Sequence, residues 1–352
     1  MQNYNILLSD SIRLNSAVLD DRCQVRLLCV MKYKLFGTRT GLAASQLILG
    51  AASLGSRRGY GAVAEDIPKI LNAYLDAGGN FIDIADQYQL GEAEEIVGRA
   101  IRPKRHDMII CSKYTRSSEI NPAPANFGNH RKAMSAAVDA SLKRLGTGHI
   151  DIFMPHFDDG NTPLEEIARG LEDLVKAGKI IYAGLANFPA WKAAAIAQLI
   201  PLAAMQLEYN LAQRTADREL LPMADHFGLG LMLYSPLAGG LLTGKYRHGA
   251  TGRLTIQSGS DYKEDGATSQ ILDTLENIAA VLDATPGQIA LAWTLTKNAF
   301  PIIGARTASH LTESFKALNI NLSVEHLERL NAVSQVRLGY PHEILQTVQR
   351  VY

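Results

Sequence analysis

Apolar and polar residues alternate along this chain in two patterns, one typical of helices and one typical of buried strands. Between residues 65 and 77 the apolar positions include Ile67, Ile70 and Leu71, which is the spacing of one helix face. The stretch NFIDIA that follows at 80–85 is short and mostly apolar, as in a strand covered on both sides. The two patterns then take turns until the chain ends.

The same reading extends to the whole chain from residue 46 onward. The predicted strands are residues 46–50, 80–85, 107–113, 150–156, 180–186, 202–210, 229–235 and 301–305. The predicted helices are residues 65–77, 92–102, 130–145, 163–177, 189–199, 217–227, 269–283, 286–297, 308–318 and 323–334. A hairpin is predicted ahead of the first strand, beginning near Lys32.

Eight strand–helix units in about 300 residues favour an α/β fold of the closed (β/α)8 barrel type, with an N-terminal hairpin and extra C-terminal helices. An open, doubly wound sheet is the alternative. The glycine fingerprint GxGxxG, which such a sheet carries after its first strand when it binds a dinucleotide, is absent. Nothing reads as a linker, so residues 31–352 are predicted to form a single domain.

Residues 1–30 differ from the rest, because they show no clear helix or hairpin pattern and hold two of the three cysteines. We interpret them as an N-terminal extension outside the core fold, although an arm packed on the body is the alternative. The three cysteines form no CxxC motif and no Cys/His metal spacing. No basic segment followed by an apolar run begins the chain, so a cytoplasmic location is expected.

Charge and hydropathy narrow the classes of partner. The 35 basic and 35 acidic residues balance, and the sequence pI is about 7.1. A nucleic-acid-binding protein would be expected to carry a basic patch, so neither nucleic acid nor an anionic membrane is an expected partner. No apolar run reaches the roughly 18 residues that a membrane-spanning helix needs.

Polar residues follow most of the predicted strands at their C-terminal ends, where barrels of this type place their active sites. In chain order they are Asp83, Tyr88, Lys113, His156, Asn187, Gln206, Tyr234, Ser235, Gly304 and Arg306. Any one of them alone would be read as a loop or packing residue. Their convergence on one end of the barrel favours a functional site.

Four of these residues fit a proton-transfer site. A tyrosine has an ordinary pKa near 10, and a nearby ammonium lowers it. Lys113 could supply the ammonium to Tyr88, while Asp83 could pair with Lys113 and hold it in place. His156 could then hydrogen-bond a substrate carbonyl, so that Tyr88 protonates the developing alkoxide, as carbonyl reduction by hydride requires.

Other interpretations of the same residues remain. Asp83 and His156 could be metal ligands, but no cluster supplies the rest of a catalytic metal site. Lys113 could form a Schiff base in an aldolase-like lyase, which would leave Asp83 and Tyr88 less well explained. Asp86 is expected to bond the turn, and Gln87 receives no role. The run GEAEE at 91–95 is read as the solvated, acidic start of a helix.

The chain resembles the aldo-keto reductase superfamily over nearly all of residues 31–345, most closely its larger-loop branch, which includes bacterial reductases and potassium-channel β subunits. The motifs are LFGTRTGLAASQLILGAASLG, NFIDIADQYQLGEAEEIVGRAI, IICSKYT, RLGTGHIDIFMPH, LVKAGKIIYAGLANF, MQLEYNL, LYSPLAGGLLTGKY and PIIGART. The resemblance implies a (β/α)8 barrel that interconverts carbonyls and alcohols with NAD(P)(H) and no metal. It implies Asp83, Tyr88, Lys113 and His156 as the catalytic tetrad. A barrel that binds NADPH and regulates a protein partner is the alternative, although those channel subunits have Asn at the position of His156.

The resemblance also implies which residues hold the cofactor, NADPH, with NADH remaining possible. It places Asn187 and Gln206 on the nicotinamide amide and Tyr234 on its ring. The remaining implied contacts, to the pyrophosphate and the adenosine end, are Ser235, Leu237, Gly239, Lys245, Gly304, Arg306, His310, Glu313 and Ser314. The chain departs from the family pattern at Ile84, Ala186, His310 and Ser314, and the last two leave the choice between NADP and NAD open.

The expected substrate is a small carbonyl or alcohol, whose identity depends on variable loops. These are residues 54–62, 114–130, 157–162 and 336–352. The first loop contains Arg57 and Arg58, which could meet an acidic substrate or could simply be solvated. Tyr60, Phe157 and Tyr340 are candidates for an apolar pocket wall. The direction of the reaction and the oligomeric state stay open.

Overall fold

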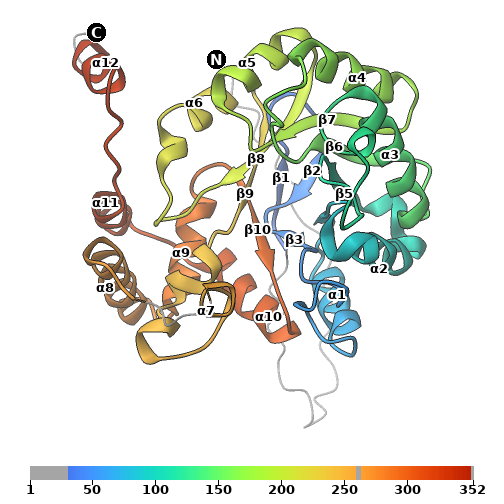
Figure 1. The fold of residues 1–352 in the computed structure, drawn as a ribbon. Helices are drawn as coiled ribbons and strands as arrows, with labels where there is room; N and C mark the ends of the chain where they lie inside the picture. The colour runs from blue at the N-terminus through green and yellow to red at the C-terminus, as the bar shows by residue number, and fades with distance from the viewer. Residues whose placement is uncertain (1–30, 259–262, 350–352) are drawn as a thin grey trace, which may run out of the picture.

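A closed barrel of parallel strands forms the centre of the computed structural model, which describes residues 31–258 and 263–349 (Figure 1). Its strands are β3 (Ile48–Gly50), β4 (Phe81–Asp83), β5 (Ile109–Tyr114), β6 (Ile150–Pro155), β7 (Ile180–Ala186), β8 (Leu202–Glu208), β9 (Gly230–Tyr234) and β10 (Phe300–Gly304). They pair in chain order, and β10 closes the barrel against β3. The predicted (β/α)8 barrel is confirmed, and the open sheet is wrong.

Helices surround the barrel close to the predicted positions. They are α1 (Ile67–Asp76), α2 (Glu92–Ile101), α3 (Arg131–Leu145), α4 (Leu164–Lys176), α5 (Ala190–Leu199), α6 (Leu220–His226), α7 (Arg253–Ser258), α8 (Gly266–Val281), α9 (Pro286–Leu295), α10 (Ala308–Lys316), α11 (Val324–Val333) and α12 (His342–Gln349). Short 3-10 turns are η1 (Tyr88–Gly91), η2 (Arg102–Asp107), η3 (Pro124–Asn126), η4 (Thr215–Asp217), η5 (Ala238–Thr243), η6 (Lys245–His248) and η7 (Ala317–Asn319). The sequence pattern missed α7 and α12.

Side-chain caps explain why some helices begin where they do. At α9, Thr285 accepts a hydrogen bond from the backbone of Gln288, and the Gln288 side chain accepts one from the backbone of Thr285. Pro286 stands at the first helical position, where its missing N–H costs nothing. Ser323 and His326 form the same reciprocal arrangement at α11. Each such cap contributes about 1 kcal/mol to helix stability.

The predicted hairpin is present and closes the N-terminal end of the barrel. Strands β1 (Tyr33–Leu35) and β2 (Ala43–Ser45) pair antiparallel, and Phe36 follows β1 into the barrel. The Phe36 ring lies 5.4 Å from that of Phe81 and 5.1 Å from that of Phe300, measured between ring centroids. Gly230 leaves room for it, since an added Cβ would lie 2.3 Å from the Phe36 ring. Ligands must therefore enter at the opposite, C-terminal end.

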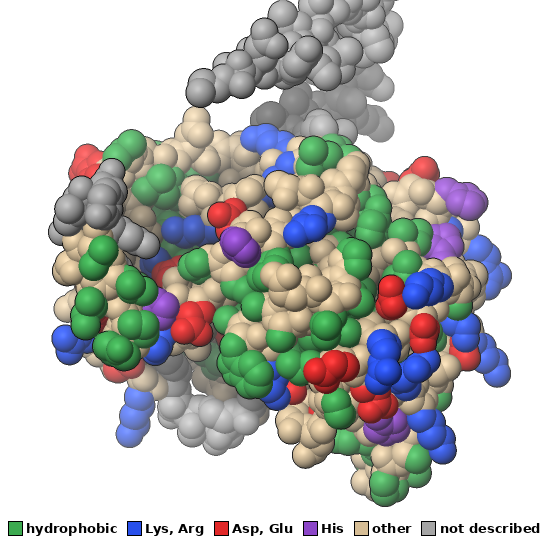
Figure 2. All heavy atoms as spheres, turned by 90° about the horizontal axis from the view of Figure 1, so that it is seen from above, with side chains coloured by type: hydrophobic (Ala, Val, Ile, Leu, Met, Phe, Trp, Pro, Cys, Tyr) green, Lys and Arg blue, Asp and Glu red, His purple; other side chains and the backbone are tan. Residues whose placement is uncertain are grey.

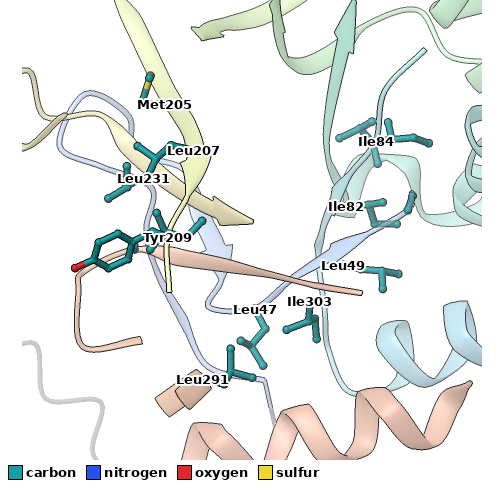
Figure 3. Close-up of a cluster of buried hydrophobic side chains, with 14 of the residues drawn as sticks. Leu47, Leu49, Ile82, Ile84, Met205, Leu207, Tyr209, Leu231, Leu291 and Ile303 are labelled. Carbon is teal, nitrogen blue, oxygen red and sulfur yellow. The ribbon is translucent and has the colours of Figure 1, made fainter. Parts of the chain in front are cut away.

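The strands separate two apolar cores because successive side chains point to opposite faces of the barrel wall. Figure 3 shows part of the outer core, with side chains of β3, β4, β8, β9 and β10 spread around the barrel wall and with Leu291 of α9. Phe81 belongs to the inner core and Ile82 to the outer one, so Asp83 points inward. On β5, Cys111 is inward in the same way, which also directs Lys113 into the barrel. The alternation thus brings both charged side chains to the barrel mouth.

The C-terminal segment departs from the compact part of the fold. Helix α12 lies apart from the barrel in Figure 1, at the end of an extended stretch after α11. Contacts near its start join it to the α6 region: Arg218 donates to the carbonyl of Tyr340, and the His342 ring lies 3.3 Å from a Glu219 oxygen. Tyr340 is 79% exposed, so its candidacy as a pocket wall is not supported.

Figure 2 shows basic and acidic side chains intermixed on one face of the molecule. Within residues 31–258 and 263–349, no single helix is long and apolar enough to cross a membrane, and only α8 with α9, a pair bent by 96°, meets those criteria jointly. The proposed extension at residues 1–30 lies outside the described residues.

Candidate active site

A buried ion pair lies at the centre of the barrel mouth. The Nζ atom of Lys113 donates to Oδ1 of Asp83 at 2.6 Å and to the carbonyl of Ile84 at 2.6 Å. The two side chains are 0% and 4% exposed. Burial lowers the pKa of Lys113, but Asp83 and then Tyr88 outweigh it, so the pKa stays above its ordinary value. Lys113 is therefore a fixed positive charge.

Tyr88 lies over this ammonium. It begins η1 in the loop after β4, and the chain turns there because Gln89 and Leu90 adopt left-handed backbone angles. Lys113 Nζ lies 5.1 Å from the centroid of the Tyr88 ring. Burial raises the pKa of Tyr88 to about 12, although Lys113 acts to lower it. The expected direction of the lysine's effect is right, but the expected net lowering is wrong, because burial is the larger influence.

His156 completes the group from the end of β6. Its ring lies 5.7 Å from that of Tyr88 in an edge arrangement and stacks on Phe157 at 4.4 Å. Burial, followed by the charges of Lys113 and Arg116, lowers the pKa of His156 to about 2. The imidazole is therefore neutral across the physiological range, and it acts as a hydrogen-bonding group and not as a charge.

Gln87, to which sequence reasoning assigned no role, contacts this imidazole. Its Nε2 lies 3.1 Å from Nδ1 of His156. An amide nitrogen can only donate, so Nδ1 accepts and the ring hydrogen resides on Nε2. The His156 Nε2–H is thereby available to a ligand oxygen. The only sequence signal was an amide side chain next to Tyr88, which periodicity cannot single out.

Asp86 and the acidic start of α2 are more buried than predicted. Burial, with a contribution from Glu94, raises the pKa of Asp86 to about 7, and its Oδ1 has no partner among the described residues. The backbone of Gln87 bonds to its carboxyl group, as the predicted turn role requires. Glu94 is fully buried and bonds Arg144 at 2.6 Å and Ser112 at 2.7 Å. The interpretation of this helix start as solvated is wrong at Glu94, whose partners fasten α2 to β5 and α3.

The nicotinamide-side candidates form a second connected group across the mouth. The Asn187 amide donates to the carbonyl of His156 at 3.0 Å and accepts from the Tyr234 hydroxyl at 2.9 Å. Gln206 donates to Asp83 Oδ1 at 2.7 Å. No described residue donates to the amide oxygen of Gln206. The arrangement thus ties Tyr234, Asn187 and Gln206 to the tetrad and leaves the Gln206 oxygen for a ligand.

The segment after β9 wraps one side of the mouth. Ser235, Ala238 and Gly239 have left-handed backbone angles, which turn the chain sharply through η5. The carbonyl of Ser235 accepts from Asn210 at 2.9 Å, which holds the start of the turn. Leu237 is half-buried beside Gly287 of α9. These residues form a connected loop, as the resemblance implies.

Two cations stand at this side of the mouth. Burial and the charge of Arg306 lower the pKa of Lys245, and neither side chain forms an ion pair with any residue in the described ranges. Gly304 ends β10 with open space where a Cβ would stand. Burial, Arg306 and Lys245 also lower the pKa of His310. Such an unneutralised cluster fits the phosphates of a dinucleotide.

Glu313 and Ser314 differ from the cations Lys245 and Arg306, because their side chains already bond to other residues of the protein. Glu313 accepts from Gln288 at 2.9 Å and from Lys316 at 2.7 Å, and the Ser314 hydroxyl donates to the carbonyl of His310. Their predicted contacts with the adenosine end stay predictions.

Within the described chain, no group of three or more His, Cys, Asp or Glu side chains could hold a metal ion.

Comparisons with known proteins agree with this geometry. The Aldo/keto reductase family matches residues 46–335. An aryl-alcohol dehydrogenase [NADP(+)] of Phanerodontia chrysosporium is 32% identical over 330 residues, covering 86% of each chain. A putative aryl-alcohol dehydrogenase of Saccharomyces cerevisiae is 31% identical, covering 89% of each chain. Norsolorinic acid reductase of Aspergillus flavus is 30% identical, covering 89% of this chain and 84% of the relative.

Proposed function

This chain belongs to the aldo/keto reductase family, which interconverts carbonyls and alcohols with a nicotinamide cofactor, and we propose that it reduces aromatic aldehydes or ketones with NADPH. The observation that carries the proposal is the buried Lys113 ammonium, held by Asp83 at 2.6 Å beneath the Tyr88 ring. The names of two relatives, both aryl-alcohol dehydrogenases and one specified for NADP(+), support the substrate class and the cofactor.

Each member of the tetrad has one task in this proposal. A nicotinamide held by Asn187, Gln206 and Tyr234 would supply the hydride for the carbonyl carbon. The Tyr88 hydroxyl donates its proton to the carbonyl oxygen, and its raised pKa keeps it protonated at neutral pH. The neutral His156 orients that oxygen through its Nε2–H. Lys113 stabilises the tyrosinate left behind, and Asp83 keeps Lys113 in position.

The other half of the mouth would hold the cofactor. Asn187 and Gln206 would bind the nicotinamide amide, and Tyr234 would contact the nicotinamide ring. The loop from Ser235 to Lys245 would hold the pyrophosphate. Arg306 and Lys245 would bind phosphate oxygens, which would favour NADPH over NADH because NADPH carries an additional phosphate.

Two alternatives fit the geometry less well. A Schiff-base lyase needs a neutral amine as nucleophile, whereas the pKa of Lys113 lies above its ordinary value and its Nζ is bonded to Asp83 and Ile84. A barrel that only regulates a partner would not need the tetrad complete. Here all four residues lie together, including His156 at the position where the channel subunits have Asn.

The test is a titration of purified protein with NADPH and NADH, followed by benzaldehyde-type and aliphatic carbonyls, with oxidation of the nicotinamide read by absorbance. We expect NADPH to bind more tightly and aromatic carbonyls to be reduced faster. Absence of cofactor consumption with every carbonyl would contradict the proposal. Borohydride trapping of a carbonyl on Lys113 would favour the lyase instead.

A further inference from the structure

A cavity of about 610 Å³ opens beside the tetrad, between the 54–62 and 114–130 loops. Its lining includes Arg58, Gln87, Arg116, Glu119, Ile120 and Phe127. Gln87 links it to the chemistry, because its side chain contacts His156 at 3.1 Å. The cavity is therefore one side chain away from His156, within reach of the substituents of a molecule whose carbonyl binds there.

Arg116 lines this cavity, and no carboxylate of the described residues pairs with its charge. Its Cζ atom lies 4.3 Å from the centroid of the Phe157 ring, which stacks on His156 at 4.4 Å. It forms no hydrogen bond or ion pair with any residue of the described ranges. The guanidinium is thus one aromatic ring away from the imidazole and is free to bind an anion.

Arg58 contributes a second charge, and its neighbour Arg57 does not. Arg58 donates through Nε to the carbonyl of Gln87 at 3.2 Å, and no carboxylate of the described chain pairs with it. Arg57 instead bonds both carboxylate oxygens of Glu95, at 3.3 and 2.9 Å, and does not line the cavity. Of the two arginines in this loop, only Arg58 is therefore placed to meet an acidic substrate.

We propose that Arg116 and Arg58 form a subsite for a carboxylate carried by the carbonyl substrate. This proposal rests on the proposed function and names the substrate class: aromatic aldehydes or ketones that bear an acidic group. The guanidinium fork matches a carboxylate geometrically. Ile120 and Phe127 supply apolar surface for the substrate's ring. Glu119 is the one carboxylate among the lining residues, so two positive charges face one negative charge.

The test compares 4-carboxybenzaldehyde with its methyl ester, which has the same reacting group and no charge. The wild-type protein should show a higher kcat/KM for the acid, and the preference should shrink at high salt because the cavity is open to solvent. In Arg116→Met the ratio of acid to ester kcat/KM should fall about fivefold, as the loss of one exposed ion-pair contact of about 1 kcal/mol implies. Arg58→Met should lower the ratio less, since Arg58 is also bonded to the backbone of Gln87.

Two matched variants sharpen the result. Arg57→Met removes the same charge one position away and should leave the ratio unchanged. Glu119→Gln removes the opposing charge and should raise the ratio. An equal effect of Arg116→Met on acid and ester would overturn the subsite. So would a rise in KM for NADPH as large as the fall in the ratio, which would assign Arg116 to the cofactor. If neither aldehyde is reduced, the proposed function fails instead.

Discussion

Two parts of the barrel mouth differ in how completely the protein bonds its own charged groups. At the ends of β4 and β5, Asp83 and Lys113 are buried and paired at 2.6 Å. After β9 and β10, burial and the charge of Arg306 lower the pKa of Lys245, and neither of these two cations has an ion-pair partner in the described chain. The first part is assembled before any ligand arrives, whereas the second has charge that a ligand must neutralise.

This difference suits the two parts to different functions, the first to catalysis and the second to cofactor binding. Groups that stabilise a transition state are most effective when they are already oriented, since no reorganisation is then needed during the reaction. Unpaired cations at a cleft instead attract and hold an anionic ligand. Substitutions in the first part should therefore lower kcat, and those in the second should raise KM for the cofactor. Substitutions at four positions test this division.

Tyr88→Phe should have the largest effect, because it removes the proton donor and little else. We expect kcat for carbonyl reduction to fall about 10³-fold, within the usual range for loss of a general acid. Binding of NADPH, measured by fluorescence titration, should stay close to that of the wild type. Turnover near the wild-type level would show that another group supplies the proton.

Lys113→Met should lower kcat about 10²-fold by removing the charge that stabilises the tyrosinate. Lys113 acts to lower the pKa of Tyr88, so its loss should raise that pKa further. Alcohol oxidation needs the deprotonated tyrosine, and its rise with pH should therefore move to higher pH in the variant.

The same change also leaves Asp83 buried without its cation, which costs about 3 to 5 kcal/mol of stability in comparable sites. The double variant Asp83→Asn with Lys113→Met serves as the control, because it restores thermal stability without restoring the ammonium. Recovery of turnover in the double variant would mean that the single variant had failed through folding.

Much of this first part could be predicted from the sequence because it depends on local rules. The period of two within NFIDIA and IICSK places Asp83 and Lys113 on the inner face, and barrel topology brings their strand ends together. Helices with a regular apolar stripe, such as residues 130–145, were predicted to within a residue or two. Helix α7 was missed because it is short, and α12 because its apolar residues face solvent away from the barrel.

Other features depend on three-dimensional surroundings that no local pattern records. The pKa of Tyr88 reflects how much water the folded chain removes from it, and this outweighs Lys113. The contact of Gln87 with His156 joins residues from β4 and β6 loops, 69 positions apart. The sequence around Glu94 is typical of a solvated helix start, but in the folded chain Glu94 accepts a hydrogen bond from Arg144 of α3.

Arg306→Met tests the second part of the mouth. We expect KM for NADPH to rise about tenfold, in line with loss of one charge-assisted contact to phosphate, while kcat changes little. KM for NADH should change less if Arg306 meets the additional phosphate of NADPH. Equal changes for both cofactors would place Arg306 on a phosphate that they share, and a large fall in kcat alone would contradict the division between the two parts.

Gln87→Leu should have the smallest effect. It tests whether the hydrogen bond from Gln87 fixes the tautomer of His156 before a ligand binds. Without the amide donor, His156 can carry its hydrogen on either nitrogen, so we expect kcat to fall only about fivefold, the cost of a hydrogen bond of about 1 kcal/mol. The nitrogen-15 chemical shifts of His156 should change from one dominant tautomer to a mixture.

Gln87→Glu is the sharper companion because it has the same size and reverses the hydrogen-bond direction. A carboxylate accepts from Nδ1–H, which leaves Nε2 without a hydrogen to offer the substrate carbonyl. We expect a larger loss of kcat than in Gln87→Leu, with the opposite tautomer dominant in the spectrum. If both variants lose activity equally and the tautomer does not change, Gln87 only fills space beside His156. The orientation of the imidazole would then come from its stacking on Phe157 and from the edge contact with Tyr88.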